Sequence, residues 1–361
     1  MNPYEKLAKV LDTIPNGFPP VPDGSHLRVL EWIFTPEEAD LASQLKLSGE
    51  TVDEIATRLN RPKEELEELL DTMFEKGQIN SWMSRSAGAR KYGLLPFAVG
   101  IYEEQVNRMD EELAQRLEQY FQHKDAFQKA VTSDPVIFQV IPVNKSVSGE
   151  LEIHNFQKAE QLIESAKAWG VRECVCRKQK SLIGEGCDYP LSVCLAFAPR
   201  ENYFDDADLT KAITKEESLK LLKEAEDAGL VHCTTNYQAG HTFICNCCTC
   251  CCGVLRGVDK VAEPREYIKT DFVMTVDADL CTGCETCIER CQFGALSVPE
   301  DICVVDPKRC IGCGVCAVVC PEEALKIKRV EAPEKPESPS NQLDWMTQRA
   351  MRRGVDPSDI M

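Results

Sequence analysis

Apolar residues recur at helical spacing through the first quarter of the chain. Thr35 is expected to begin one helix, because Pro36 follows it in the first turn. Thr51 is expected to begin the next helix, since Glu54 stands three residues later, which is the spacing of a capping box. A third helix and two short strands, the strands within residues 78–92, complete the pattern.

The middle of the chain alternates short apolar runs with amphipathic segments. Apolar runs bounded by Pro or Gly predict strands, and apolar residues at every third or fourth position predict helices. The helix before Gly229 has the clearest end, because glycine readily adopts the left-handed conformation that closes a helix. The expected elements are a helical segment over 94–121, strands over 136–143 and 171–177, and helices over 157–168 and 215–228.

Cysteine is unusually frequent, with 20 in a chain of 361 residues. Residues 1–10 mix Lys with Glu and precede no apolar segment, so no signal peptide is expected. No run reaches the roughly 18 apolar residues of a membrane span. The protein is therefore expected to be cytoplasmic, where so many thiols indicate metal ligands instead of disulfides. Exposed clusters would survive best in a reduced or anaerobic cytoplasm. A net charge of −18 favours basic protein partners over nucleic acid.

Eight of the cysteines form two runs of the same spacing. The runs begin 29 residues apart, at 281 and 310, and each is followed by an Ala-Leu pair and a predicted strand. Zinc ribbons use paired C-x2-C knuckles and need no third cysteine in each, whereas iron–sulfur clusters use this longer spacing. The sequence therefore predicts two iron–sulfur clusters. The runs are Cys281-x2-Cys284-x2-Cys287-x3-Cys291 and Cys310-x2-Cys313-x2-Cys316-x3-Cys320.

This segment closely resembles the bacterial dicluster ferredoxin domain, over about residues 272–329. The resemblance implies a small pseudo-twofold fold that binds two [4Fe–4S] clusters, with the fourth cysteine of each run ligating the other cluster. Gln292 stands where the family usually has Pro in the first run, which changes the loop but removes no ligand. The implied ligands are Cys281, Cys284, Cys287 and Cys320 for one cluster, and Cys310, Cys313, Cys316 and Cys291 for the second.

Eleven further cysteines fall within residues 174–252, six of them within residues 245–252. Unassigned thiols at this density would oxidise or scavenge metal, so a metal or redox task is expected. Three interpretations are open: a third iron–sulfur cluster shared between the two ends of this region, a zinc or other structural metal site, and a thiol/disulfide redox switch. The candidate metal ligands are Cys174, Cys176, Cys187, Cys194, Cys245, Cys247 and Cys248.

Three single residues near these cysteines carry separate expectations. Arg177 is expected to stabilise an anionic cluster electrostatically. His232 is either a ligand to a metal or, as is commoner for a single histidine at a helix end, solvated. Cys303, outside both runs, is expected to be a small buried residue in an apolar strand.

An enzymatic interpretation rests on Cys251-Cys252-Gly253. The sequence is similar to the CCG motif of heterodisulfide-reductase-type catalytic subunits, which implies a catalytic cluster. The spacing departs from that family, because the upstream cysteines at 194 and 233 are too far and too near. The C-x2-C pair that follows the CCG motif in that family would here have to come from the ferredoxin-like segment.

Three helices and a hairpin over about residues 26–95 resemble a winged-helix domain. The third helix would enter the DNA major groove in such a domain, yet it is strongly acidic over residues 63–71. Basic residues are confined to the expected wing, at Arg85, Arg90 and Lys91. Because DNA binders neutralise phosphates with Lys and Arg, protein docking or a structural role is favoured over DNA binding.

The sequence as a whole predicts an α+β multidomain protein. The expected parts are a helical, winged-helix-like docking module over 1–130, a Cys-rich central α/β metal-binding module over 131–265, a dicluster ferredoxin domain over 266–330 and a flexible tail over 331–361. The expected function is single-electron transfer to or from a redox enzyme partner. The alternatives are a catalytic iron–sulfur oxidoreductase subunit and an iron–sulfur redox sensor.

Overall fold

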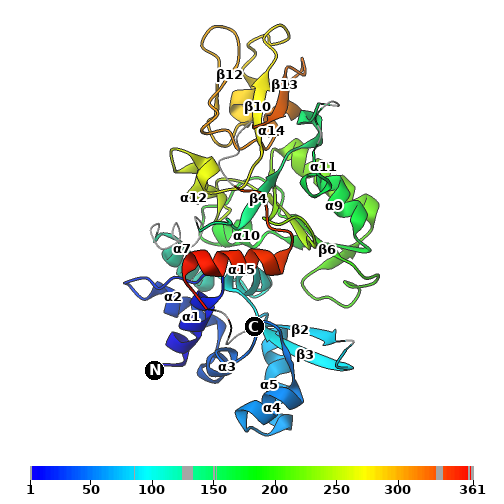
Figure 1. Cartoon of the computed structure of the whole chain (residues 1–361). Helices are drawn as coiled ribbons and strands as arrows, with labels where there is room; N and C mark the ends of the chain where they lie inside the picture. The colour runs from blue at the N-terminus through cyan, green and yellow to red at the C-terminus, as the bar shows by residue number, and fades with distance from the viewer. Residues whose placement is uncertain are drawn as a thin grey trace. The chain divides into compact units, whose positions relative to one another are not determined.

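The computed structural model describes residues 2–84, 86–123, 133–148, 151, 153–330, 336–356 and 358 (Figure 1). The chain divides into two compact units. Unit 1 comprises Met1–Asp134 and Met346–Met361, and unit 2 comprises Pro135–Trp345. Secondary structure is mixed helix and strand, as an α+β protein requires. Within the described residues, no helix is both long and apolar enough to cross a membrane.

Unit 1 is mainly helical. Thr35 and Thr51 each cap a helix with a reciprocal capping box to Glu38 and Glu54, which confirms both predicted helix starts. The predicted helical segment over 94–121 is confirmed at α7, whereas its first half forms only short helical pieces interrupted by non-helical backbone at Ala98, Val99 and Gly100. The elements are α1 (Pro3–Thr13), α2 (Ser25–Ile33), α3 (Pro36–Ala42), β1 (Glu50–Thr51), α4 (Val52–Leu59), α5 (Lys63–Glu75), β2 (Ile79–Ser84), β3 (Ala89–Leu94), a π-helical turn (Phe97–Ile101), α6 (Tyr102–Glu104) and α7 (Glu111–Phe121).

The three strands of unit 1 form a small antiparallel sheet in the order β1-β3-β2. Arg85, a basic residue predicted for the connection between β2 and β3, lies outside the described residues. The last helix, α15 (Gln342–Arg353), returns to this unit through Arg349, whose fully buried Nε donates a hydrogen bond of 2.7 Å to the carbonyl of Pro15. The end of the chain is thus packed in part, and is not simply a flexible tail.

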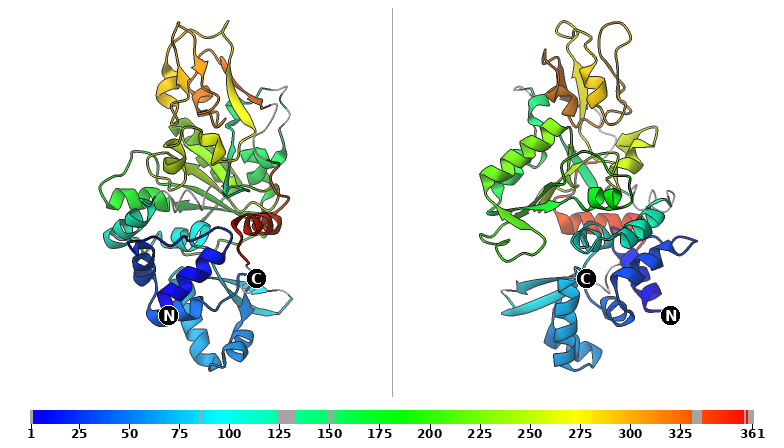
Figure 2. Two further views of the ribbon diagram at one scale, coloured as in Figure 1. Left: turned by 60° about the vertical axis from the view of Figure 1, so that its left-hand side comes forward. Right: turned by 180° about the vertical axis from the view of Figure 1, so that it is seen from behind.

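Unit 2 is built around a six-stranded antiparallel sheet in the order β4-β8-β9-β6-β5-β7 (Figure 2). Residues Val175–Leu182 form helix α10, so the predicted strand over 171–177 ends at Glu173 and the next turn is helical. The strands are β4 (Phe138–Ile141), β5 (Ala168–Glu173), β6 (Ser192–Ala198), β7 (Lys211–Ile213), β8 (Val231–Thr235) and β9 (Phe243–Cys247).

Helices α9 (Ala159–Ser165) and α11 (Lys215–Ala228) cover one face of this sheet. Their apolar side chains pack against Leu195 of β6 and Ile244 of β9. Thr214 caps the start of α11, and Gly229 ends it with φ 90°, as the sequence predicts. Because side chains alternate along a strand, the residues next to Leu195 and Ile244 point to the opposite face.

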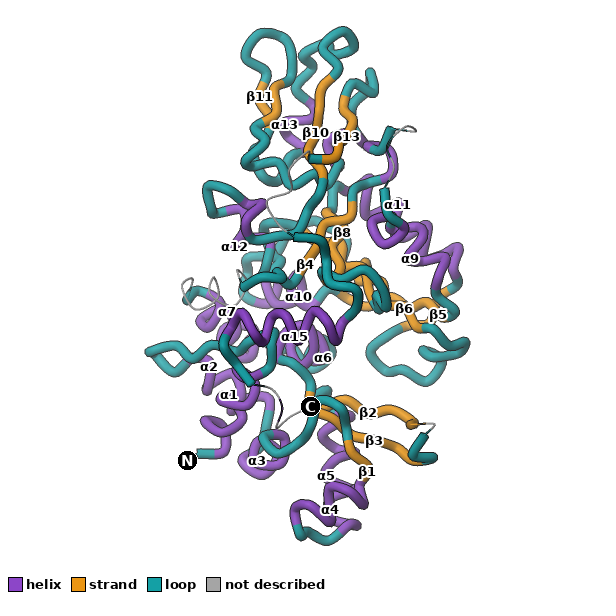
Figure 3. The backbone as a smooth tube through the Cα atoms, viewed as in Figure 1, coloured by secondary structure: helices purple, strands orange, loops and turns teal. Residues whose placement is uncertain are grey.

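The last part of unit 2 repeats a strand, a cysteine run and a short helix. Strand β10 pairs antiparallel with β13, and β11 pairs antiparallel with β12 (Figure 3). The elements are α12 (Leu255–Asp259), β10 (Phe272–Val276), α13 (Thr286–Arg290), β11 (Leu296–Ser297), β12 (Val304–Val305), α14 (Val315–Val318) and β13 (Leu325–Arg329).

Candidate metal centres

The two cysteine runs near the end of unit 2 form matching loops. Gly283 and Gly312 hold equivalent positions, and each has φ 65°. A side chain would not fit at either position. A Cβ on Gly283 would lie 2.5 Å from the carbonyl oxygen of Asp301, and one on Gly312 would lie 2.4 Å from that of Phe272. Both loops therefore need glycine for the backbone conformation and for a close approach.

Backbone N–H groups point at the sulfurs of both runs, and they come from the opposite half of the repeat. The N–H of Cys303 donates to Sγ of Cys281 at 3.4 Å, and the N–H of Met274 donates to Sγ of Cys310 at 3.4 Å. Hydrogen bonds to the sulfurs are one way in which a protein stabilises an iron–sulfur cluster and tunes its potential. The donor groups present therefore fit such a cluster in each loop.

The structure places the fourth cysteine of each run beside the other run. Cys320 lines the same cavity as the first three cysteines of run one, together with Cys303. Cys303 is buried, as predicted, and its sulfur lies 3.6 Å from that of Cys287. Cys291 is close enough to Cys310 for its charge to raise the pKa of that thiol, after the larger effect of burial. This placement is the one that the exchanged ligation requires, and the ligation itself stays a prediction.

The two loops differ in exposure. Cys284 in the first loop is exposed. In the second loop burial raises the pKa of Cys313 to about 12, and Cys310 and Cys316 are buried. The first loop thus faces solvent and the second faces the rest of unit 2.

Comparison with known proteins agrees with this geometry. A family model described as a 4Fe–4S binding domain matches residues 274–297 and again residues 303–326. The two matches support a ferredoxin-like dicluster domain with two [4Fe–4S] clusters. No curated protein and no solved structure matches the chain.

The second loop packs directly on the six-stranded part of unit 2. The N–H of Val143 donates to the carbonyl of Cys313 at 3.0 Å. Gly314, with φ 78°, approaches Ser146 so closely that a Cβ would lie 2.2 Å from the Ser146 hydroxyl. The equivalent position in the first loop is Glu285, which is exposed. The two loops are therefore asymmetric at this position, which is docked in the second loop and exposed in the first.

The first run contributes a second attachment through the residues around its last cysteine. Gln292 accepts a hydrogen bond of 2.8 Å from the N–H of Thr249 and donates one of 2.5 Å to the carbonyl of Gly229. Arg290 donates to the carbonyls of Glu226 and Ala228 at the end of α11. The departure from Pro at position 292 thus supplies a side chain that ties the ferredoxin-like domain to the Cys-rich region.

Seven of the central cysteines gather on the face of the sheet that α9 and α11 leave open. Cys194, Cys245 and Cys233 lie across the neighbouring strands β6, β9 and β8, with Cys233 directly opposite Cys245. Thiols contact one another around a ring, from Cys174 through Cys194 and Cys245 to Cys247, and back through Cys252 and Cys176. Cys233 contacts Cys247 from outside the ring. We call these seven the sheet-face group: Cys174, Cys176, Cys194, Cys233, Cys245, Cys247 and Cys252.

Hydrogen bonds between these thiols favour the thiolate at two positions, Cys194 and Cys247, and the pKa is raised at the other five: Cys174, Cys176, Cys233, Cys245 and Cys252. Hydrogen bonds from Cys174 and then Cys245 lower the pKa of Cys194 to about 5. Hydrogen bonds from neighbouring thiols, first Cys233, also lower the pKa of Cys247 well below its usual range. Arg177 is buried beside these sulfurs, and both its terminal nitrogens donate to the carbonyl of Asn246. The expected electrostatic role of Arg177 therefore has a structural basis.

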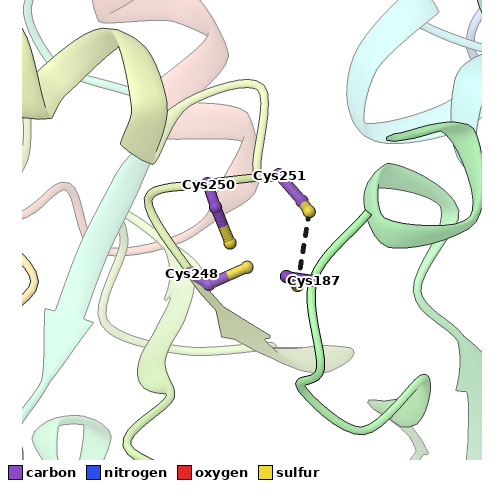
Figure 4. Close-up of side chains that lie close together, drawn as sticks. All are labelled: Cys187, Cys248, Cys250 and Cys251. Carbon is purple, nitrogen blue, oxygen red and sulfur yellow. Dashed lines mark hydrogen bonds between the residues drawn. The ribbon is translucent and has the colours of Figure 1, made fainter. Parts of the chain in front are cut away.

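The other four cysteines form a separate set, the turn group, made of Cys187, Cys248, Cys250 and Cys251 (Figure 4). Their four sulfurs all lie within 4.8 Å of one another, and the sulfurs of Cys187 and Cys251 are 3.5 Å apart. Cys248 and Cys251 pack with Val193 and Ala225, on the α11 side of the sheet. This set could bind a metal.

The structure thus distributes the seven predicted ligands between two places. Cys174, Cys176, Cys194, Cys245 and Cys247 belong to the sheet-face group, whereas Cys187 and Cys248 belong to the turn group. One cluster cannot use all seven predicted ligands, but the sheet-face group still brings together cysteines from both ends of the region, as a shared cluster would need.

Sequence reasoning left Cys233 and Cys250 out of the candidate ligands, and it considered Cys251 and Cys252 only in the CCG interpretation. The alternation of Cys245 and Cys247 within β9 was a usable signal, because residues two apart in a strand share a face. His232, by contrast, is not solvated, so the commoner of the two expectations for it is wrong. It is fully buried, with Nδ1 2.5 Å from Asn246 Oδ1 and Nε2 3.4 Å from Glu226 Oε1, so both ring nitrogens have partners.

Proposed function

We propose that this protein carries single electrons between a redox partner and a metal centre held by the sheet-face group. Its ferredoxin-like domain would supply two [4Fe–4S] clusters, which accept and release one electron at a time. The sheet-face group would hold a further iron–sulfur cluster. The partner is a redox enzyme or another electron-transfer protein.

The observation that carries this proposal is the adjacency of the second cysteine run and the sheet-face group. Cys313 is near enough to Cys233 for its charge to contribute to the raised pKa of the Cys233 thiol, after the hydrogen bond that Cys233 donates to Cys247 and after burial. Cys233 in turn contacts Cys247 of the ring. A centre in the second loop and a centre on the sheet face would therefore be neighbours within one compact unit.

The exposed first loop is a suitable place for electron exchange with the partner. Glu285 and Glu289 are exposed beside Cys284, and Glu322 follows the second run on the same cavity rim. An acidic rim around an exposed redox site favours encounter with a basic surface on the partner, mainly through the association rate. Electrons would enter or leave the protein at this loop, and would pass between it and the inner metal centres.

The winged-helix-like part of unit 1 belongs to the proposal as a docking module. Its sheet pairs β1, which precedes α4, with β3, and pairs β3 with β2, both of which follow α5. The exposed face of α5 is acidic at Glu64, Glu65, Glu67 and Glu68, which suits a basic protein partner better than DNA.

Metal and sulfide analysis of anaerobically purified protein tests the proposal. Two clusters account for about eight iron and eight sulfide per chain, and a third raises both toward about twelve. Replacing Cys194 by Ser should remove one reducible centre and lower iron toward about eight, while the ferredoxin-like clusters still accept electrons from dithionite. Iron of about eight in both proteins, with no change in the EPR spectrum, would show that the sheet face holds no third cluster.

A catalytic role for the sheet-face group is the second candidate. The specific observation is that seven thiols exceed the four that a cubane ligates, so a cluster there could have an unusual ligand set or an open position. Small thiols or disulfides should then change the EPR signal of that centre. We expect no change, since an electron relay needs closed coordination.

A further inference from the structure

The turn group differs from the other cysteine sets in how close its sulfurs are. All four sulfurs lie within 4.8 Å of one another. Around one zinc ion with Zn–S bonds of about 2.3 Å, tetrahedral sulfurs are separated by about 3.8 Å. In a cubane each cysteine binds a different iron at a different corner, so the sulfurs lie farther apart. The spacing therefore matches one ion better than a cluster.

A tight turn after β9 produces this arrangement. The N–H of Cys252 donates to the carbonyl of Cys248 at 3.1 Å, which closes the turn over residues 248–252. Cys248, Cys250 and Cys251 then face Cys187, which follows the loop around Gly184 after α10 (Figure 4). Three ligands from one turn and a fourth from a distant loop make a complete set of four.

The turn also separates the two thiol groups. β9 ends at Cys247, and Cys248 is the first residue of the turn that follows. Cys248 and Cys251 pack against Ala225 on the α11 side, whereas Cys247 and Cys252 contact each other within the ring. A metal in the turn group would be separate from any centre on the other face.

We propose that Cys187, Cys248, Cys250 and Cys251 bind one zinc ion in a closed tetrahedral site. Four protein thiolates leave no open position, which is typical of structural zinc and not of catalytic zinc. A four-sulfur tetrahedral site suits zinc or iron, and zinc keeps one charge state while electrons pass through the neighbouring centres. The ion would fix the loop around Cys187 to the turn after β9.

An ion at this position would also stabilise the neighbouring parts of the proposed electron-transfer path. Thr249, inside the turn, donates its N–H to Gln292 of the ferredoxin-like domain at 2.8 Å. Residues 247 and 252, at the two ends of the turn, supply ring thiols. Fixing the turn therefore holds two thiols of the sheet-face group and one attachment of the ferredoxin-like domain in place.

Zinc analysis and zinc X-ray absorption of the full chain test the proposal. We expect one zinc per chain, with four sulfur neighbours at about 2.3 Å. Cys250→Ser is the most informative variant because Cys250 is the exposed member of the set. It should replace one sulfur neighbour by a lighter atom or lose the zinc, with the iron content and the EPR spectrum of the ferredoxin-like clusters unchanged.

The matched control is Cys194→Ser, which removes a sheet-face thiol. It should leave zinc at one per chain with four sulfurs, whatever it does to the iron. This reciprocal pattern distinguishes the zinc site from the proposed electron-transfer path, because the zinc content is measured independently of the iron content and of cluster reduction. Absence of zinc, zinc lost equally from both variants, or iron in place of zinc would each overturn the proposal. Cys250→Ser protein that is unfolded by circular dichroism would be replaced by Cys187→Ser in the same comparison.

Discussion

Gly312 shows how tightly a single residue can be constrained by a binding loop. Its φ of 65° is in the left-handed region, and its missing Cβ leaves room for the carbonyl of Phe272. The preceding cysteine, Cys310, receives the N–H of Met274, two residues after Phe272. A shift of this strand would therefore move both the loop and the hydrogen bond to its sulfur.

Gly312→Ala is expected to weaken the second loop selectively. The left-handed conformation alone costs about 1–2 kcal/mol for a non-glycine residue, and the contact at 2.4 Å forces the backbone apart as well. Thermal unfolding should occur at a lower temperature, and iron should fall by about four per chain. Gly253→Ala is the control, because a Cβ added there would meet nothing within 4 Å and the φ of Gly253 lies outside the left-handed region. Equal effects of the two substitutions would contradict this reasoning.

The exchange of ligands between runs is testable at Cys291. Cys291→Ser should damage the cluster held with Cys310, Cys313 and Cys316, because Cys291 lies beside that set. Cys320→Ser should damage the other cluster, since Cys320 lines the cavity of the first run. EPR of the two variants, compared with the unmodified protein during stepwise reduction, provides the measurement. Loss of the cluster nearest in sequence in each variant would show that the ligands are not exchanged.

Single residues were predictable here to the extent that spacing alone determines their neighbours. The eight run cysteines follow from a local pattern. Cys233 does not, because its nearness to Cys245 depends on the pairing of β8 with β9. Gln292 was recognised as a departure from the ferredoxin pattern, yet its hydrogen bonds to Thr249 and Gly229 arise from chain segments that are distant in sequence.

Helix α11 connects the sheet, the turn group and the ferredoxin-like domain. Its inner face packs on the sheet, and its last turn presents carbonyl groups to Arg290. A cation at the C-terminal end of a helix interacts favourably with the helix dipole, and its hydrogen bonds satisfy carbonyls that the helix leaves free. The close approach explains why Gly229 has no room for a side chain, since a Cβ would lie 2.8 Å from the Arg290 guanidinium.

Arg290→Ala is expected to loosen this attachment. Loss of charged hydrogen bonds to the end of α11 should cost about 2 kcal/mol of unfolding free energy. Lys308→Ala is a suitable control, because Lys308 is well exposed and its pair with Glu263 is worth at most about 1 kcal/mol. Urea unfolding of the two variants provides the measurement. A stability of Arg290→Ala equal to that of the control would mean that the arginine does not hold the helix end.

At the level of elements, amphipathic helices with distinct caps were the most predictable. The boundaries of α11 agree with the sequence because Thr214 and Gly229 act within one turn of the helix. The region 171–177 was predicted as a strand, but Val175 begins helix α10 with Cys174 at its N-cap position. Short apolar runs do not distinguish a strand from a buried helix, and here sheet pairing ends at Glu173.

For the whole molecule, the distribution of charge decides between protein and nucleic-acid partners. The chain has a net charge of −18. The two basic residues of the β2–β3 hairpin that the structure describes are also engaged within unit 1. Arg90 pairs with Asp71 at 3.0 Å and donates to the hydroxyl of Ser81 at 2.6 Å, and Lys91 donates to the carbonyl of Gly49 at 3.2 Å. The described part of the hairpin therefore leaves little basic surface for phosphates.

We therefore expect no salt-sensitive binding of duplex DNA in either the oxidised or the reduced protein. DNA affinity depends on counterion release when Lys and Arg bind phosphates. Helix α5 exposes Glu65 and Glu68, where a recognition helix would need Lys or Arg side chains. Gel shifts at several salt concentrations, on dithionite-reduced and air-oxidised samples, provide the measurement. The double variant Arg90→Ala/Lys91→Ala is the internal comparison, because it removes the basic residues of the hairpin that the structure describes. Binding that appears in one oxidation state, weakens with salt and disappears in this variant would favour a redox sensor over an electron carrier.

Absence of binding in all samples, together with electron transfer to a cationic acceptor that slows as salt increases, is the outcome that the acidic surface predicts.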